Sequence, residues 1–193
     1  MIKFFFHRKE ELYLSLKEIL GFCPHHIEYY KLALIHKSKG GRDEKGHTVN
    51  NERLEYLGDA ILSAIVADFL YKKYPYKGEG FLTELRSKIV SRTSLNDLAA
   101  KTGLLGLVEY QRGSSNVFKS VGGDAFEALV GAMYIEKGYR FTQRVMVERI
   151  LRTYLDVDAM ATKEWNYKSK LIDWGQKQHK KISFEVVRAF TQG

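Results

Sequence analysis

The carboxylates of the segment Asn51–Asp59 are the side chains whose spacing most directly indicates chemistry. On a helix, with about 100° of rotation per residue, Glu55 lies about 60° and Asp59 about 20° from Glu52. Like charges at such spacings repel each other, so a helix that keeps all three needs a cation beside them. Hard divalent cations take oxygen ligands from Asp and Glu. The stripe therefore predicts a divalent-metal site, with a solvated acidic helix face as the alternative.

A second acidic pair, Asp124 and Glu127, lies three residues apart on another strongly apolar predicted helix. Asp124 alone could simply favour the helix N-terminus through the helix dipole. Two helices that each present carboxylates from apolar surroundings are better explained by a shared site, which Glu79 could reach from a turn between two glycines. An all-oxygen set of this kind suits Mg²⁺, with Mn²⁺ as a substitute. The six candidates are Glu52, Glu55, Asp59, Glu79, Asp124 and Glu127.

The acidic stripe begins the longest predicted helix, Asn51–Tyr74. Because the middle of this helix is apolar nearly all round, we expect it to be buried at the centre of the fold. Gly58 lies inside it, where glycine costs about 1 kcal/mol relative to alanine, so another backbone or a ligand should approach there closely. Asp68 falls on the opposite side from Glu52 and is interpreted as a structural polar residue.

The remaining apolar periodicity predicts an all-α fold class for residues 1–155. The segment 38–48 has three glycines and no periodicity, so we expect an exposed loop there. Thr93 is a candidate N-cap for the helix that follows it. Further helices are predicted at 9–20, 25–36, 81–91, 94–101, 122–135 and 141–155.

The composition changes after residue 155. Residues 156–164 are predicted as a linker and 166–178 as an amphipathic helix, and the alternation at 182–186 predicts a strand. A lone helix and strand cannot bury a core of their own. Residues 165–193 are therefore interpreted as the N-terminal fragment of a second domain.

Charge and cysteine content narrow the class of protein. The 193 residues include 31 Lys and Arg against 23 Asp and Glu, a net charge of +8 that makes a polyanion such as nucleic acid a natural partner. A single cysteine, Cys23, excludes an internal disulfide and a Cys-rich zinc site. No apolar run is long enough for a membrane span or a signal peptide, so we expect a cytoplasmic protein without a membrane partner.

Two histidines are the other candidates for chemistry. Neither His36 nor His47 lies in a metal-ligand spacing. His36 ends a predicted helix, where a cationic ring is favoured by the dipole, so a structural role is the preferred interpretation.

The segment Asn51–Ala60 resembles the signature of the ribonuclease III endonuclease domain. Three further segments agree with it in order and spacing: Ala33–Ser38, Glu79–Thr83 and Gly123–Gly131. The resemblance covers about residues 10–155. Residues 166–190 resemble the first helix and first strand of the double-stranded-RNA-binding domain that follows in bacterial members.

The resemblance implies an α-helical homodimer that hydrolyses double-stranded RNA to 5′-phosphate and 3′-hydroxyl ends, in rRNA and mRNA processing. It implies that Tyr56 enters the dimer interface, with a buried core aromatic as the alternative. The implied magnesium ligands are Glu55, Asp59, Asp124 and Glu127, and Glu52 and Glu79 would assist a second metal or the substrate.

Recognition of duplex RNA should depend on phosphates and 2′-hydroxyls. The candidate basic contacts to phosphate are Lys77, Arg86, Lys88 and Arg92. The alternative is that these residues form a solvated basic face. The sequence stops at Gly193, before the remaining strands and the basic second helix that the resemblance implies for the RNA-binding domain, and Ile172 stands where relatives often have a polar residue facing the minor groove. Together these features predict weaker affinity for long duplexes than in an intact enzyme.

Two other functions remain open at this point. A catalytically silent RNA-binding scaffold could share the fold, although it would have no need for mutually repelling carboxylates. An unrelated helical metal protein acting on phosphoesters would not explain the basic C-terminal fragment.

Overall fold

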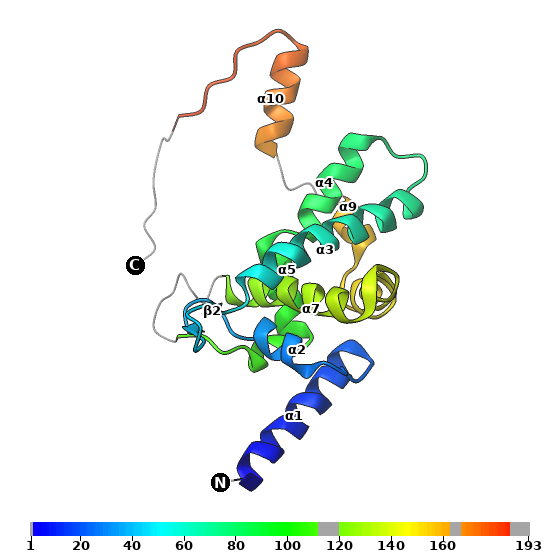
Figure 1. Ribbon diagram of the computed structural model, residues 1–193. Coiled ribbons are helices and arrows are strands. Elements are labelled where there is room, and N and C mark those ends of the chain that lie inside the picture. The colour runs from blue at the N-terminus through cyan, green and yellow to red at the C-terminus, as the bar shows by residue number, and fades with distance from the viewer. Residues whose placement is uncertain (1, 112–119, 163–166, 186–193) are drawn as a thin grey trace. The chain divides into compact units, whose positions relative to one another are not determined.

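Two long helices, α3 (Glu52–Lys73) and α7 (Val121–Arg144), pack against each other at the centre of the fold. The computed structural model describes residues 2–111, 120–162 and 167–185 (Figure 1). It divides the chain into two compact units, Met1–Val157 and Asp158–Gly193. Helices dominate both, which confirms the all-α fold class.

The two central helices meet through glycines. A β-carbon on Gly58 of α3 would overlap with the carbonyl oxygen of Glu127, and one on Gly131 of α7 would overlap with the carbonyl oxygen of Leu54. The two backbones can approach so closely only because both positions lack a side chain. The close approach expected at Gly58 is therefore confirmed, and its neighbour is the backbone of α7.

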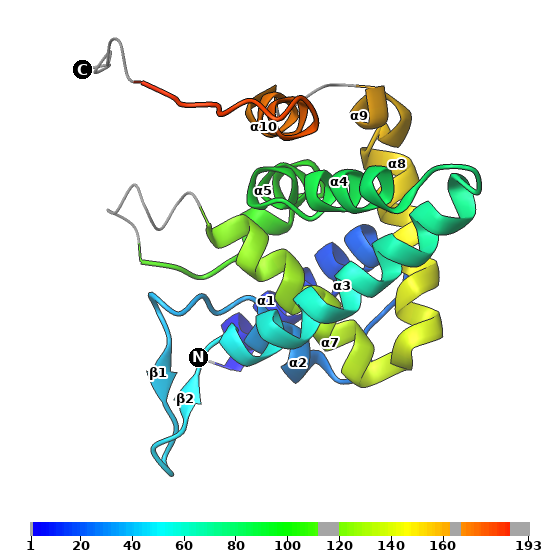
Figure 2. The same ribbon diagram turned by 90° about the horizontal axis from the view of Figure 1, so that it is seen from above.

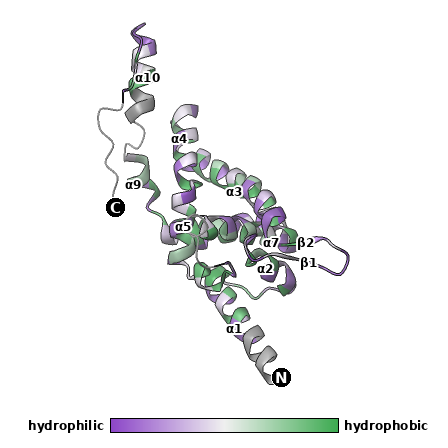
Figure 3. Cartoon of the chain, turned by 90° about the vertical axis from the view of Figure 1, so that its left-hand side faces the viewer, coloured by the Kyte–Doolittle hydropathy of each residue, from purple (hydrophilic) through white to green (hydrophobic). Residues whose placement is uncertain are grey.

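Shorter helices surround the central pair, and the buried side chains of the described residues are almost all apolar. Figure 3 colours the helices by hydropathy and shows hydrophobic and hydrophilic residues mixed along them. α5 and α2 pack on α7, and α4 packs on α3. Ser91 rather than Thr93 caps α5, since its hydroxyl oxygen accepts a hydrogen bond from the Ser94 amide at 3.3 Å. The bounds are α1 Ile2–Leu20, α2 Ile27–Ala33, α4 Glu79–Ile89, α5 Arg92–Lys101 and the short η1 Leu104–Leu107.

After α7 the chain continues as the π-helix η2 (Val145–Leu151) and α8 (Arg152–Tyr154). The break expected between the two predicted helices occurs at Gly138, whose φ of 74° interrupts α7. In η2, the Arg149 guanidinium donates to the carbonyl oxygens of Glu18 and Ile19 at the end of α1. This contact supplies partners for carbonyls that a helix end leaves free.

The start of α2 is fixed by a carboxylate from α7. Glu136 accepts the backbone amides of His25 and His26 at 2.5 and 2.8 Å, and the Tyr30 hydroxyl at 2.6 Å. α2 ends at Ala33, three residues before the predicted end at His36. The chain therefore leaves the helix before His36, which changes the environment of this residue.

The segment predicted as a loop at 38–48 contains a short antiparallel hairpin, β1 (Gly41–Arg42) and β2 (Thr48–Val49). Figure 2 shows the hairpin projecting from the helices. Its turn is held by Asp43, which accepts the His47 amide at 2.8 Å and pairs with the His47 ring at 3.0 Å. Side-chain bonds of this kind stabilise turns without periodicity.

The second unit contains α10 (Tyr167–Lys177), within the helix predicted at 166–178. A short helix, α9 (Val157–Thr162), lies in the segment predicted as a linker. Residues 182–185 are not assigned as a strand, and Val186 lies outside the described residues. Among the described helices, none is both long enough and apolar enough to cross a membrane.

Candidate metal centre

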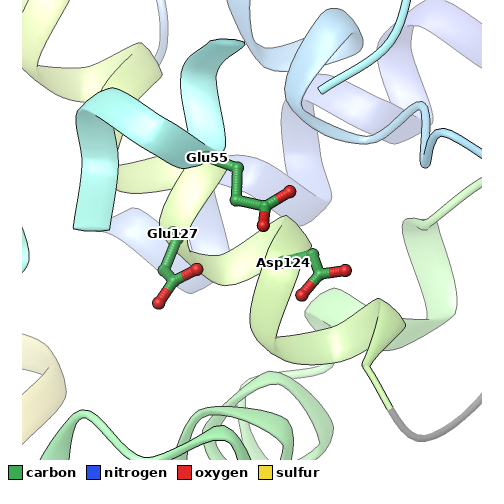
Figure 4. A group of neighbouring side chains, drawn as sticks. All are labelled: Glu55, Asp124 and Glu127. Atoms are coloured by element: carbon green, nitrogen blue, oxygen red, sulfur yellow. The ribbon is translucent and has the colours of Figure 1, made fainter. Parts of the chain in front are cut away.

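Three carboxylates from the two central helices meet beside their crossing. Glu55 comes from α3, and Asp124 and Glu127 from the first turns of α7. One oxygen atom from each lies within 4.8 Å of the other two. Figure 4 shows the three side chains as neighbours, with Glu55 on α3 and the other two on α7. The glycine contact at Gly58 explains this convergence, because it brings the N-terminal part of α3 against the backbone of Glu127.

The cluster is an unfavourable place for negative charge alone. Asp124 is only 5% exposed. Burial, followed by the charges of Asp59, Glu55 and Asp124, raises the pKa of Glu127 to about 8. Burial and the charge of Asp124 also raise the pKa of Glu55. A cation would relieve both effects, which is the electrostatic signature of a metal-binding carboxylate group.

Asp59 and Glu52 lie at the edge of the same site. Both line a hollow of about 520 Å³ that also contains Glu55, Glu127 and Lys37. The Glu52 carboxylate accepts a hydrogen bond from the side-chain Nδ2 of Asn50 at 2.8 Å and lies 3.9 Å from the Lys37 ammonium. The structure thus brings Asp59 beside the three clustered carboxylates and leaves Glu52 at the rim.

Glu79 lies elsewhere. It begins α4 and accepts the Thr83 hydroxyl at 2.7 Å. It lines a different hollow, together with Ala67 and Tyr71 of α3. These two residues lie more than two helical turns beyond Asp59, a distance of about 12 Å or more along the helix axis. The expectation that Glu79 reaches the centre from the turn is not met within this chain.

Of the basic residues, some lie near the acidic cluster and others lie away from it. The charge of Arg92 offsets a small part of the rise in the pKa values of Glu55 and Glu127. Lys77 and Arg86 line the hollow that contains Glu79, and Lys88 pairs with Glu84 at 2.9 Å. Arg92 and Lys37 are therefore the basic residues that this structure places next to the acidic cluster.

Tyr56 and Asp68 can be compared directly with the sequence predictions. Tyr56 is 81% exposed and lines the acidic hollow, so it does not belong to the core of this chain. Asp68 accepts hydrogen bonds from Lys72 at 2.8 Å and Gln143 at 2.6 Å. These partners agree with the structural role inferred for Asp68 from its position on the helix.

Sequence reasoning missed His36 as a neighbour of the site. Its side chain is 2% exposed, and its Nε2 lies 3.4 Å from Asp124 Oδ2. The expected position of His36 at a helix end is wrong because α2 ends at Ala33, whereas the structural role preferred from the sequence stays a prediction. The local sequence features that could have indicated a buried His36 are the two apolar residues before it, Leu34 and Ile35, and Ser38 two positions later.

The residues present fit a divalent cation. The cluster offers only carboxylate oxygens, as Mg²⁺ and Mn²⁺ prefer. One of these oxygens, Glu55 Oε2, is buried and has no hydrogen-bond partner among the described residues. Buried polar atoms normally have partners, so a ligand is the direct explanation for this one.

The fold is that of a ribonuclease-III-like domain. The family profile with that description matches residues 27–154, and the chain belongs to this family. It is 49% identical over 189 residues to Ribonuclease 3 of Bacteroides thetaiotaomicron, which covers 98% of this chain and 61% of that protein. It is 48% identical to Ribonuclease 3 of Bacteroides fragilis, covering 96% of this chain and 64% of that protein. The chain thus spans about three fifths of the length of these relatives.

A solved structure agrees with the fold. The nuclease domain of ribonuclease III from Campylobacter jejuni superposes with a TM-score of 0.63 at 29% identity, over 72% of this chain and 96% of that chain. The description of that protein refers to structural flexibility in a region involved in dimer formation.

Proposed function

We propose that this chain is the nuclease-bearing part of a metal-dependent endoribonuclease that hydrolyses double-stranded RNA. The proximity of Glu55, Asp124 and Glu127 supports the proposal most strongly. Burial and mutual repulsion disfavour three negative charges there, which is why the pKa of Glu127 is raised. A silent scaffold of the same fold would gain nothing from retaining this repulsion.

We further propose that Glu55, Asp59, Asp124 and Glu127 hold Mg²⁺, for which Mn²⁺ would substitute. A bound divalent cation supplies activation of the attacking water and neutralises charge that develops on the phosphate oxygens. The chain's own contribution is to fix the carboxylates on two helices whose separation cannot change without disturbing the glycine contact.

In the proposed reaction, the water oxygen bonds to phosphorus and the bond from phosphorus to the 3′ oxygen breaks. The 3′ oxygen leaves as a hydroxyl, and the other fragment keeps a 5′-phosphate. Lys37 and Arg92, at the edge of the acidic cluster, would hold the flanking phosphates by charge. A net charge of +8 favours a polyanionic substrate of this kind.

The proposed active form is a homodimer. The exposed ring of Tyr56, at the edge of the acidic hollow, supports an interface there, and the Campylobacter jejuni relative is described as having a region involved in dimer formation. We place the reaction in the cytoplasm, in the processing of rRNA and mRNA, because structured transcripts supply duplex RNA there.

The deciding experiment incubates a perfect RNA duplex with the protein, with and without Mg²⁺, beside a Glu127→Gln variant. We expect cutting only by the unmodified protein with Mg²⁺, and fragments that carry 5′-phosphates. The proposed activity is wrong if the protein binds the duplex without cutting it. Undiminished cutting by Glu127→Gln would show that this carboxylate has been given the wrong role.

A further inference from the structure

We propose that His36 is a positioning residue that holds Asp124 in place for metal binding by donating its Nε2 proton to Asp124 Oδ2. The inference rests on the proposed function and adds a residue outside the carboxylate set. Its starting observation is geometric: the two atoms lie 3.4 Å apart, and both side chains are buried.

The backbone around His36 is fixed from two sides. Its amide donates to the carbonyl of Glu109 at 2.9 Å, and the Glu109 amide donates to Leu34 at 2.8 Å, which makes a parallel bridge between the two segments. On the other side, the Asn51 amide donates to Ile35 at 2.8 Å. Because Asn51 precedes the first turn of α3, these bonds tie the His36 segment directly to the helix that carries Glu55.

Local hydrogen bonds define the tautomer of the His36 ring. The backbone amide of Ser38 donates to Nδ1 at 3.1 Å, so Nδ1 must be an acceptor. The Ser38 hydroxyl lies 2.8 Å from the same nitrogen and itself accepts the Gln111 amide at 3.0 Å. With Nδ1 occupied as an acceptor, the proton of the neutral ring is on Nε2.

The Nε2 proton faces Asp124. Nε2 is buried and makes no hydrogen bond within the described part of the chain. A shift of a few tenths of an ångström in the Asp124 carboxylate would form a charge-assisted bond, which is among the stronger hydrogen bonds in proteins. Asp124 Oδ2 would then be held by His36, and the other carboxylate oxygen would remain for the cation.

Partners that orient metal-binding side chains commonly affect metal affinity by about 10–100-fold when they are removed. A purely structural histidine would not couple to the metal in this way. The hairpin offers a matched comparison, because His47 also pairs with an aspartate, Asp43, at 3.0 Å, but is exposed and lies outside the acidic hollow.

The test measures Mn²⁺ affinity of the full chain by calorimetry for the unmodified protein, His36→Leu, His36→Gln and His47→Leu. We expect His36→Leu to weaken Mn²⁺ binding about 10-fold or more. Glutamine can donate from a similar position, so His36→Gln should recover part of the affinity, and His47→Leu should match the unmodified protein. Equal affinity in His36→Leu and the unmodified protein would overturn the inference.

A second measurement keeps the inference testable if His36→Leu does not fold. The ¹⁵N chemical shifts of the His36 ring in the unmodified protein distinguish the two neutral tautomers, and we expect the proton on Nε2. A proton on Nδ1 would refute the inference. If the unmodified protein binds no Mn²⁺ and cuts no duplex, the proposed function itself fails. If it binds Mn²⁺ and cuts the duplex, but His36→Leu binds Mn²⁺ equally well, only the role of His36 is rejected.

Discussion

The carbonyl oxygen of Glu127 lies against the α-carbon of Gly58, in the space that any side chain at position 58 would occupy. One of these residues carries a carboxylate of the acidic cluster, and the other lies one turn from Glu55 and next to Asp59. Packing and chemistry therefore depend on the same contact between α3 and α7.

Substitution of Gly58 by alanine should destabilise the fold. Helix propensity alone would favour alanine by about 1 kcal/mol, but the added carbon overlaps with backbone, and we expect a net loss of at least about 2 kcal/mol. Urea unfolding followed by circular dichroism measures this directly. Gly80→Ala is the matched control, because nothing lies within 4 Å of its added carbon. An unchanged midpoint for Gly58→Ala would show that the helices separate freely.

The pKa of Glu127 predicts how stability changes with pH without metal. Folding raises this pKa from 4.5 to about 8, so the folded state binds more protons than the unfolded state between these values. The free energy of unfolding should therefore fall as pH rises through this range. Thermal unfolding in EDTA from pH 5 to 9 measures the slope. Glu127→Gln should flatten it, and parallel curves for the two proteins would contradict this origin.

Divalent metal should stabilise the folded chain at neutral pH. At a free concentration 100 times the dissociation constant, a ligand adds about 2.7 kcal/mol, which corresponds to about 5–10 °C in a chain of this size. Differential scanning fluorimetry with Mn²⁺ measures the shift, and Asp124→Asn should abolish most of it. Glu79→Gln should keep the shift, because Glu79 lies in a different hollow; its loss would bring Glu79 back into the site.

Tyr56 should affect assembly rather than folding. Because its ring is 81% exposed, Tyr56→Ala should leave the unfolding midpoint of dilute protein nearly unchanged, whereas truncation of a core aromatic costs about 3–5 kcal/mol. Sedimentation velocity should show a shift from dimer toward monomer. Tyr76→Ala, at a ring that is 99% exposed and outside the acidic hollow, serves as the control. Identical sedimentation of all three proteins would remove Tyr56 from the proposed interface.

The sequence predicts those parts of the site that depend on one helix at a time. The stripe from Glu52 to Asp59 and the pair at Asp124 and Glu127 follow from helical spacing, and the cost of Gly58 inside a helix indicates close packing. These features need no knowledge of the tertiary fold, so periodicity alone identifies them.

Features that depend on how distant segments meet were not accessible in this way. The place of His36 is set by a bridge to Glu109, far away in the chain, and no local pattern encodes that pairing. Glu79 was expected at the cluster because its turn has the right composition, but the position of α4 along α3 decides where it lies. Residues 182–185 have period-two alternation but are not assigned as a strand, because a strand is defined by backbone hydrogen bonds to a second strand, which alternation does not encode.

The glycine crossing also limits how this protein can change over evolutionary time. A larger residue at Gly58 or Gly131 would damage the fold and the site in one step. A related protein can therefore lose the reaction and keep the fold more easily by replacement of the acidic side chains than by replacement of these glycines. Inactive members of such a lineage should retain the small residues at the crossing long after the carboxylates have disappeared.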